Sequence, residues 1–140
     1  MINQYSRTEL LIGSDGLEKL KNSRVAVFGV GGVGGFTVEA LARSGVGTID
    51  IIDNDTVSLT NINRQIIATH STVGKLKVDV MEERIKDISP STVVNKYDCF
   101  FLPENAENFD FRRFEPWALR ESSWAASNSC QTSTKHTPFR

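Results

Sequence analysis

The chain is 140 residues long, with 39% hydrophobic and 24% charged residues and a formal net charge of −1. This composition is typical of one soluble globular domain and excludes a fibrous, collagen-like or wholly disordered chain, and the balanced charge excludes a broad cationic surface for nucleic acid. No apolar run approaches the roughly 18 residues that cross a bilayer, and residues 1–7 do not have the pattern of a secretory signal.

Two short helices are predicted first. Residues 6–9 have the Ser-x-x-Glu form of a capping box, so a helix is expected to start at Ser6, and Ser14 can cap a second one. A buried strand follows over 24–29, and then a helix over 34–44 that Gly45 is expected to close in the left-handed conformation.

The alternation continues with a second strand over 48–53 and a helix over 75–88, which ends before Pro90 because the residue before proline disfavours the helical conformation. A third strand is expected to begin at Thr92. Strands separated by helices predict an α/β fold, a doubly wound parallel sheet.

The segment 29–35 is rich in glycine and lies between the first strand and the next helix. Gly29, Gly31 and Gly34 match the spacing G-x-G-x-x-G. Glycines let the chain turn tightly and let a phosphate approach backbone N–H groups at the positive end of the helix. The strand before and the helix after favour this interpretation over a tight turn without a ligand.

Asp53 ends the second strand, 19 residues after Gly34. A carboxylate in this place can accept hydrogen bonds from both ribose hydroxyls of a nucleotide on the glycine loop. The alternative is an aspartate that only caps the next turn. Together, the glycines and Asp53 predict a nucleotide site without specifying which nucleotide.

Two cations beyond Asp53 bear on that choice. A nicotinamide dinucleotide has only two phosphates, which the glycine loop and helix end can bind, so Arg64 and Lys77 suit a triphosphate. Arg64 can bind phosphate oxygens in a fork, and Lys77 can supply a point charge to a leaving pyrophosphate. Taken singly, Arg64 could form a surface ion pair, and Lys77 could be a solvated lysine of the first helical turn, as expected for Lys75.

The ordered set of motifs resembles a known family. The patterns G-x-G-G-x-G, D-x-D-x-V, N-x-N-R-Q and G-x-x-K begin at Gly29, Asp53, Asn61 and Gly74. This set is similar to the ubiquitin-activating-enzyme-like superfamily of bacterial adenylating proteins, the ThiF/MoeB/HesA type. The stretches 5–8, 29–34, 39–47 and 63–77 are most similar to its tRNA threonylcarbamoyladenosine dehydratase branch, and the resemblance covers residues from about 5 to 111.

This resemblance implies a Rossmann-like domain that uses ATP with Mg²⁺ to adenylate a carboxylate. In the dehydratase branch the carboxylate belongs to the threonylcarbamoyl group on adenosine 37 of certain tRNAs, and ring closure with release of AMP gives a net dehydration. The resemblance also implies a homodimer, in which Arg7 reaches into the partner subunit's ATP site. Its catalytic residues would be Arg64, Lys77 and Arg7, and the nucleotide would contact Gly29, Gly31, Gly32, Gly34, Asp53, Asp55 and Asn61.

The composition changes after residue 111. Residues 1–111 contain 22 Val plus Ile and residues 112–140 contain none, so the last part cannot supply a parallel strand that is buried on both faces. The family's magnesium-binding aspartate, which follows such a strand, is not found. We therefore expect an ATP-binding domain over 1–111 that is incomplete on its C-terminal side, weak ATP binding, and a disordered or frameshifted tail over 112–140.

Two other functions stay open. One is a ubiquitin-like sulfur-carrier adenylyltransferase of molybdopterin or thiamin synthesis. The other is a dinucleotide-binding oxidoreductase or a noncatalytic nucleotide-binding module, which would not need Arg64 or Lys77. Cys99 and Cys130 form neither a disulfide framework nor a zinc pair, which favours the reducing cytoplasm, and no membrane partner is expected.

Overall fold

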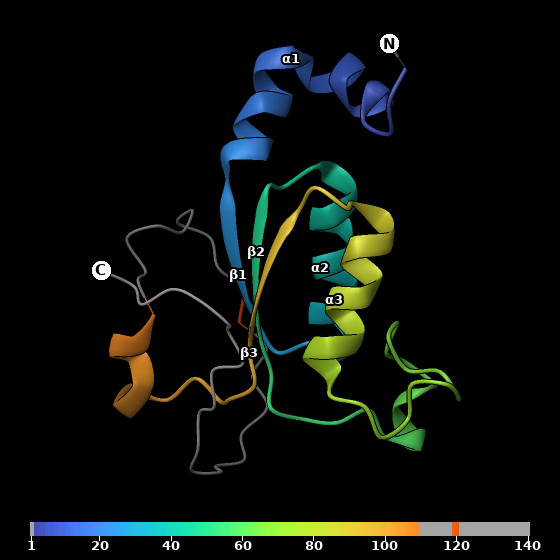
Figure 1. Ribbon diagram of the computed structural model, residues 1–140, viewed down its shortest axis with the longest axis vertical. Coiled ribbons are helices and arrows are strands. Elements are labelled where there is room, and N and C mark those ends of the chain that lie inside the picture. The colour runs from blue at the N-terminus through green and yellow to red at the C-terminus, as the bar shows by residue number, and fades with distance from the viewer. Residues whose placement is uncertain (1, 110–118, 121–140) are drawn as a thin grey trace.

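The computed structural model describes residues 2–109 and 119–120, which form one parallel sheet with helices beside it (Figure 1). The central strands are β1 (Arg24–Phe28), β2 (Thr48–Ile52) and β3 (Val93–Tyr97). A two-residue strand, β4 (Leu119–Arg120), pairs with the end of β1, and the sheet order is β3-β2-β1-β4. Apart from Leu119 and Arg120, the predicted tail over 112–140 lies outside the described residues.

Two helices connect the central strands and lie on the same face of the sheet (Figure 1). They are α2 (Gly34–Ser44) and α3 (Lys77–Ile88). A strand order of 3-2-1 with right-handed crossovers places both helices on one face. The bounds of α2 are those predicted, and Gly45 closes it at φ 94°, which confirms the left-handed cap.

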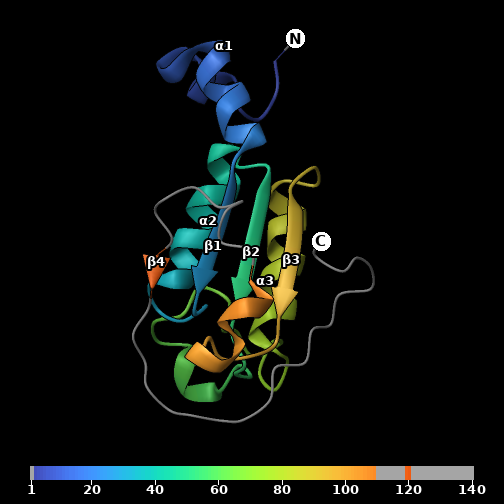
Figure 2. The same cartoon turned by 90° about the vertical axis from the view of Figure 1, so that its left-hand side faces the viewer.

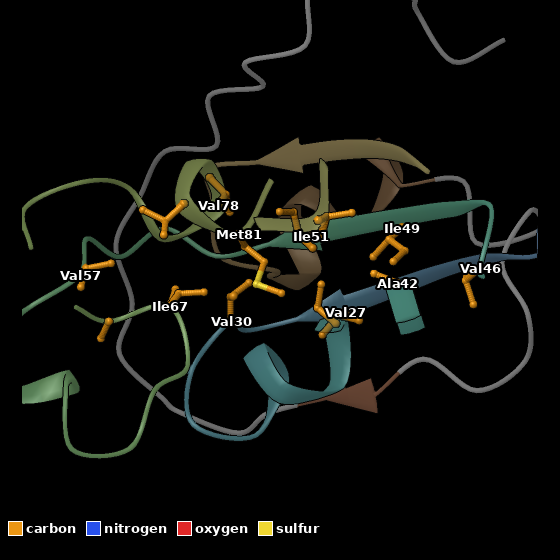
Figure 3. Close-up of a cluster of buried hydrophobic side chains, with 14 residues drawn as sticks. Val27, Val30, Ala42, Val46, Ile49, Ile51, Val57, Ile67, Val78 and Met81 are labelled. Carbon is orange, nitrogen blue, oxygen red and sulfur yellow. The ribbon is translucent and has the colours of Figure 1, made fainter. Parts of the chain in front are cut away.

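The main core lies between the sheet and these two helices (Figure 3). Side chains alternate along a strand, so every second residue of β1 and β2 points toward the helices. Burying one Ile or Met side chain contributes about 1.5–3 kcal/mol to folding. The fully buried members from the strands and helices are Val27, Ile49, Ile51, Val38, Ala42, Val78, Met81 and Ile85.

The opposite face carries a smaller cluster beside the short helix η2 (Pro103–Asn108), which Figure 2 shows in front of the strand ends. The alternation that buries Ile49 and Ile51 also places Asp50 on this face, fully buried. Its carboxylate accepts hydrogen bonds from the Arg24 guanidinium at 2.6 Å and the Asn95 amide at 2.6 Å. Burial raises the pKa of Asp50, and both partners oppose that shift.

The N-terminal helix α1 (Ser6–Asn22) is interrupted at Gly13, where φ is 73°, so the prediction of two short helices is confirmed. The predicted capping box is wrong. The Ser6 hydroxyl accepts a hydrogen bond from the Asn3 N–H, and the Glu9 N–H donates to the Tyr5 carbonyl. The Asn3 side-chain oxygen accepts the Tyr5 N–H at 2.8 Å and so organises this turn, and α1 begins at Ser6 as predicted. In the part of the chain that the structure describes, no helix has the length and apolar character needed to span a membrane.

Candidate nucleotide-binding site

The glycine loop begins directly after β1, at the end of the sheet where the strands have their carboxyl termini. Gly29 has φ 91°, a conformation that side chains disfavour, and its N–H donates to the Ile52 carbonyl at 2.7 Å. The chain then enters α2 at Gly34. The Val30 side chain is fully buried and lies in the main core with Ile67 (Figure 3). The burial of Val30 in the main core thus anchors the loop. Gly31 and Gly32 follow, just before the N-terminus of α2.

Asp53 follows β2 and connects the glycine loop to the next segment. One carboxylate oxygen accepts the Val30 N–H at 2.7 Å, and the other accepts the Asp55 N–H at 2.8 Å. The second bond means that Asp53 does cap the next turn. Burial raises the pKa of Asp53, opposed by these two backbone hydrogen bonds. Each carboxylate oxygen can accept a further bond, so both stay able to accept ribose hydroxyls.

A short antiparallel pairing brings the start of α3 to Asp53. The Gly74 N–H donates to the Val57 carbonyl at 2.8 Å, and the Lys77 N–H donates to the Asp55 carbonyl at 3.0 Å. The Lys77 ammonium then lies 2.9 Å from the Asp55 carboxylate and 4.0 Å from that of Asp53. Only 7% of the Lys77 side chain is exposed. The alternative of a solvated Lys77 is therefore wrong, whereas Lys75 is exposed as expected.

Arg64 follows the short helix η1 (Leu59–Asn61) in the chain, and its backbone lies near Gly32 of the glycine loop. A Cβ atom placed on Gly32 would be 3.9 Å from the Arg64 carbonyl oxygen and 4.0 Å from its Cγ. The guanidinium donates to the Thr60 carbonyl and the Asn63 side chain, both at 3.0 Å. Among the described residues Arg64 makes no ion pair, so the alternative of a surface ion pair is not what the structure shows.

Asn61 and Gln65 shape the turn that carries Arg64. The side-chain oxygen of Asn61 accepts the Ser58 N–H at 2.9 Å. The backbone carbonyl of Asn61 accepts the backbone N–H groups of Arg64 and Gln65. Gln65 is buried, and its Oε1 is the one buried side-chain polar atom without a hydrogen-bond partner in the described part of the chain. In the sequence, Gln65 stands out only as the last residue of the motif N-x-N-R-Q, and it is not among the predicted site residues.

Arg7 is not brought to this site. It is exposed in the first turn of α1. Just before this helix, the Tyr5 hydroxyl lies 2.7 Å from the Ser89 hydroxyl, which precedes β3. The Gly47 N–H, before β2, donates to Leu20 near the other end of α1. Both contacts lie where the strands begin, and Figure 1 shows α1 at the end of the sheet away from the loops that follow β1 and β2. The role of Arg7 in a partner subunit stays a prediction.

The site combines a glycine loop, a buried carboxylate and two cations, a donor set that fits a nucleotide with several phosphates. Residues 2–109 and 119–120 contain no group of three or more His, Cys, Asp or Glu side chains that could hold a metal ion. The expectation of Mg²⁺ stays a prediction.

The chain is similar to known proteins in both sequence and structure. The ThiF family profile matches residues 5–113. The tRNA threonylcarbamoyladenosine dehydratase of Bacillus subtilis is 57% identical over 109 residues, covering 78% of this chain and 43% of the relative. The probable adenylyltransferase/sulfurtransferase MoeZ of Mycobacterium tuberculosis is 37% identical over 116 residues, covering 81% of this chain and 29% of the relative. The chain thus spans about two fifths of the dehydratase's length.

Among solved structures, the Escherichia coli tRNA N6-threonylcarbamoyladenosine dehydratase in complex with ATP superposes with a TM-score of 0.73. It is 43% identical, and the match covers 74% of this chain and 43% of that chain. Escherichia coli MccB is 34% identical with a TM-score of 0.66, covering 72% of this chain and 32% of that chain. The predicted α/β, Rossmann-like parallel fold is confirmed.

Proposed function

Since the chain belongs to the ThiF family, we propose that it binds ATP and contributes to the adenylation of a carboxylate. The carboxylate proposed is the threonylcarbamoyl group on adenosine 37 of a tRNA, whose activation leads to ring closure and net dehydration. Support comes from 57% identity to a tRNA threonylcarbamoyladenosine dehydratase and from the ATP complex of the Escherichia coli relative.

The observation that carries the proposal is that Lys77 and the segment carrying Arg64 both lie close to residues that contact or form the glycine loop. Lys77 is buried beside Asp53, whose carboxylate accepts the Val30 N–H of the loop, and a Cβ on Gly32 would be 3.9 Å from the Arg64 backbone oxygen and 4.0 Å from its Cγ. These residues come from three segments far apart in the chain. A triphosphate supplies the negative charge that such a pair of cations can neutralise.

The proposed reaction assigns a role to each of these residues. Asp53 would accept the ribose hydroxyls, and the backbone of Gly31 and Gly32 would lie against the phosphates. A substrate carboxylate oxygen attacks the α-phosphorus, and the bond from that phosphorus to the pyrophosphate oxygen breaks. Arg64 and Lys77 would stabilise the negative charge that develops on the separating phosphates. A nucleophile within the modification then attacks the acyl carbon, and AMP leaves.

The remaining parts of the expected assembly are proposals of the same kind. They are a homodimer in which Arg7 serves the partner's site, a tRNA partner, Mg²⁺ bound with ATP, and a cytoplasmic location. We also propose that residues 112–140 do not belong to the ATP-binding domain over 1–111, although the two residues of β4 pair with the end of β1. The described residues offer no metal-binding group, so no residue is assigned to Mg²⁺.

Isothermal titration of the whole chain with ATP–Mg²⁺ and with NADH tests the proposal. We expect ATP to bind, and we expect Arg64→Ala to lower the ATP affinity by about tenfold or more, which is the effect of losing a charged hydrogen bond. Arg43→Ala is the matched control, because Arg43 pairs with Glu39 at the far end of α2. Binding of NADH but not ATP would show that the adenylation proposal is wrong.

The second candidate function is that of a sulfur-carrier adenylyltransferase, because the name of the relative MoeZ includes adenylyltransferase and sulfurtransferase. An assay of pyrophosphate release separates the two candidates. Pyrophosphate release that depends on threonylcarbamoylated tRNA supports the dehydratase reaction. Release that depends instead on a ubiquitin-like carrier protein would assign the chain to the alternative.

A further inference from the structure

Asp55 holds Lys77 through both its backbone and its side chain. The Asp55 carbonyl accepts the Lys77 N–H at 3.0 Å, and its carboxylate contacts the Lys77 ammonium at 2.9 Å. The two side chains differ in exposure, since 59% of the Asp55 side chain is exposed and only 7% of that of Lys77. An exposed carboxylate is therefore the hydrogen-bond acceptor of a buried ammonium.

The two carboxylates near Lys77 are not equivalent. Asp53 is 8% exposed, 4.0 Å from the ammonium, and accepts hydrogen bonds from the backbone at Val30 and Asp55. The Asp55 carboxylate makes one hydrogen bond within the described residues, and that bond is to Lys77. Asp55 can therefore move away from Lys77 without breaking the link between the glycine loop and β2, whereas Asp53 cannot.

A phosphate that binds Lys77 must compete with the Asp55 carboxylate for the same ammonium. We propose that Asp55 is a positioning residue, an exchangeable counter-ion that keeps Lys77 beside the glycine loop and yields it to a phosphate of the bound nucleotide. The inference rests on the proposed function for the identity of that nucleotide, ATP. It replaces the role that the motif suggested for Asp55, which was contact with the nucleotide itself.

The first test needs no nucleotide. The whole chain is acetylated with N-hydroxysuccinimidyl acetate, and the rate at each lysine is followed by mass spectrometry. We expect Lys77 to react more slowly than exposed Lys75, and Asp55→Asn to raise the rate at Lys77 severalfold without changing that at Lys75. Asp79→Asn is the matched control, because it removes a carboxylate 2.6 Å from the ammonium of Lys96. An unchanged rate at Lys77 in Asp55→Asn would overturn the proposal.

The second test measures binding of ATP and of inorganic tripolyphosphate by isothermal titration. We expect Asp55→Asn to tighten both about two- to fivefold, the factor that a partly exposed ion pair represents. In the Lys77→Met background the same change should have no effect. Weaker binding by Asp55→Asn, or equal tightening with Met at position 77, would overturn the proposal. If the unaltered chain binds neither probe, the proposed function fails, while the acetylation rates still decide whether Asp55 holds Lys77.

Discussion

Adding one methyl group is expected to have different consequences at two glycines of this chain. At Gly47 it should lower the stability of the fold, and at Gly32 it should lower the affinity for ATP. A Cβ atom on Gly47 would lie 1.7 Å from the Lys21 carbonyl oxygen, far inside van der Waals contact. The residue cannot shift away easily, because its N–H donates to Leu20 and its carbonyl accepts the Val93 N–H. Overpacking commonly costs 1–3 kcal/mol, and a clash with backbone held on both sides puts Gly47→Ala at about 3 kcal/mol or more of lost stability.

At Gly32 the nearest atom to an added Cβ is the Arg64 carbonyl oxygen at 3.9 Å, an ordinary contact. The free energy of unfolding of Gly32→Ala should therefore change by no more than about 0.5 kcal/mol. The methyl group would instead occupy space that the proposed phosphate needs. We expect the ATP affinity to fall by about tenfold or more, which corresponds to about 1.4 kcal/mol of binding free energy.

Urea unfolding followed by circular dichroism measures the first quantity, and isothermal titration with ATP measures the second. Each variant is the control for the other, since both make the same chemical change. A Gly47→Ala chain as stable as the unaltered protein would refute the packing argument. A Gly32→Ala chain that binds ATP with unchanged affinity would refute the close approach of phosphate to this loop.

Asp53→Ala should abolish ATP binding and lower the free energy of unfolding by about 2–4 kcal/mol, because the Val30 and Asp55 N–H groups each lose a charged acceptor. Its far-ultraviolet circular dichroism should stay nearly unchanged, and unaltered ATP affinity would count against the ribose assignment. Burial, followed by the charge of Asp50, raises the pKa of Tyr97 to about 12. Because the unfolded phenol ionises near pH 10, the stability that comes from the neutral ring is lost as the pH rises from about 10 to about 12. The urea midpoint should thus fall more steeply with alkaline pH in the unaltered chain than in Tyr97→Phe, and equal slopes would contradict this.

The order of helices and strands was predictable because it depends on local patterns. Val and Ile runs mark β1 and β2, and the glycines at 34 and 45 bracket α2, whose bounds match the prediction. The start of α1 at Ser6 matches the prediction, but its cap was less accessible. The Ser6 hydroxyl can bond either to the helix or to the residues before it, and only the fold around Tyr5 selects the Asn3 turn.

The motifs in the sequence predicted which side chains lie near the glycine loop, because their types and order are typical of nucleotide-binding proteins, and the structure brings Asp53, Asp55 and Lys77 together there. That they bind a nucleotide stays a prediction. Their partners depend on the parallel sheet, which brings the ends of β1 and β2 together although Val30 and Asp53 are 23 positions apart in the chain. The burial of Lys77 and its pairing with Asp55 arise from the short antiparallel contact between 55–57 and 74–77. Backbone hydrogen bonds of this kind use groups that are common to nearly all residues, so the pattern of side chains in the sequence does not predict them.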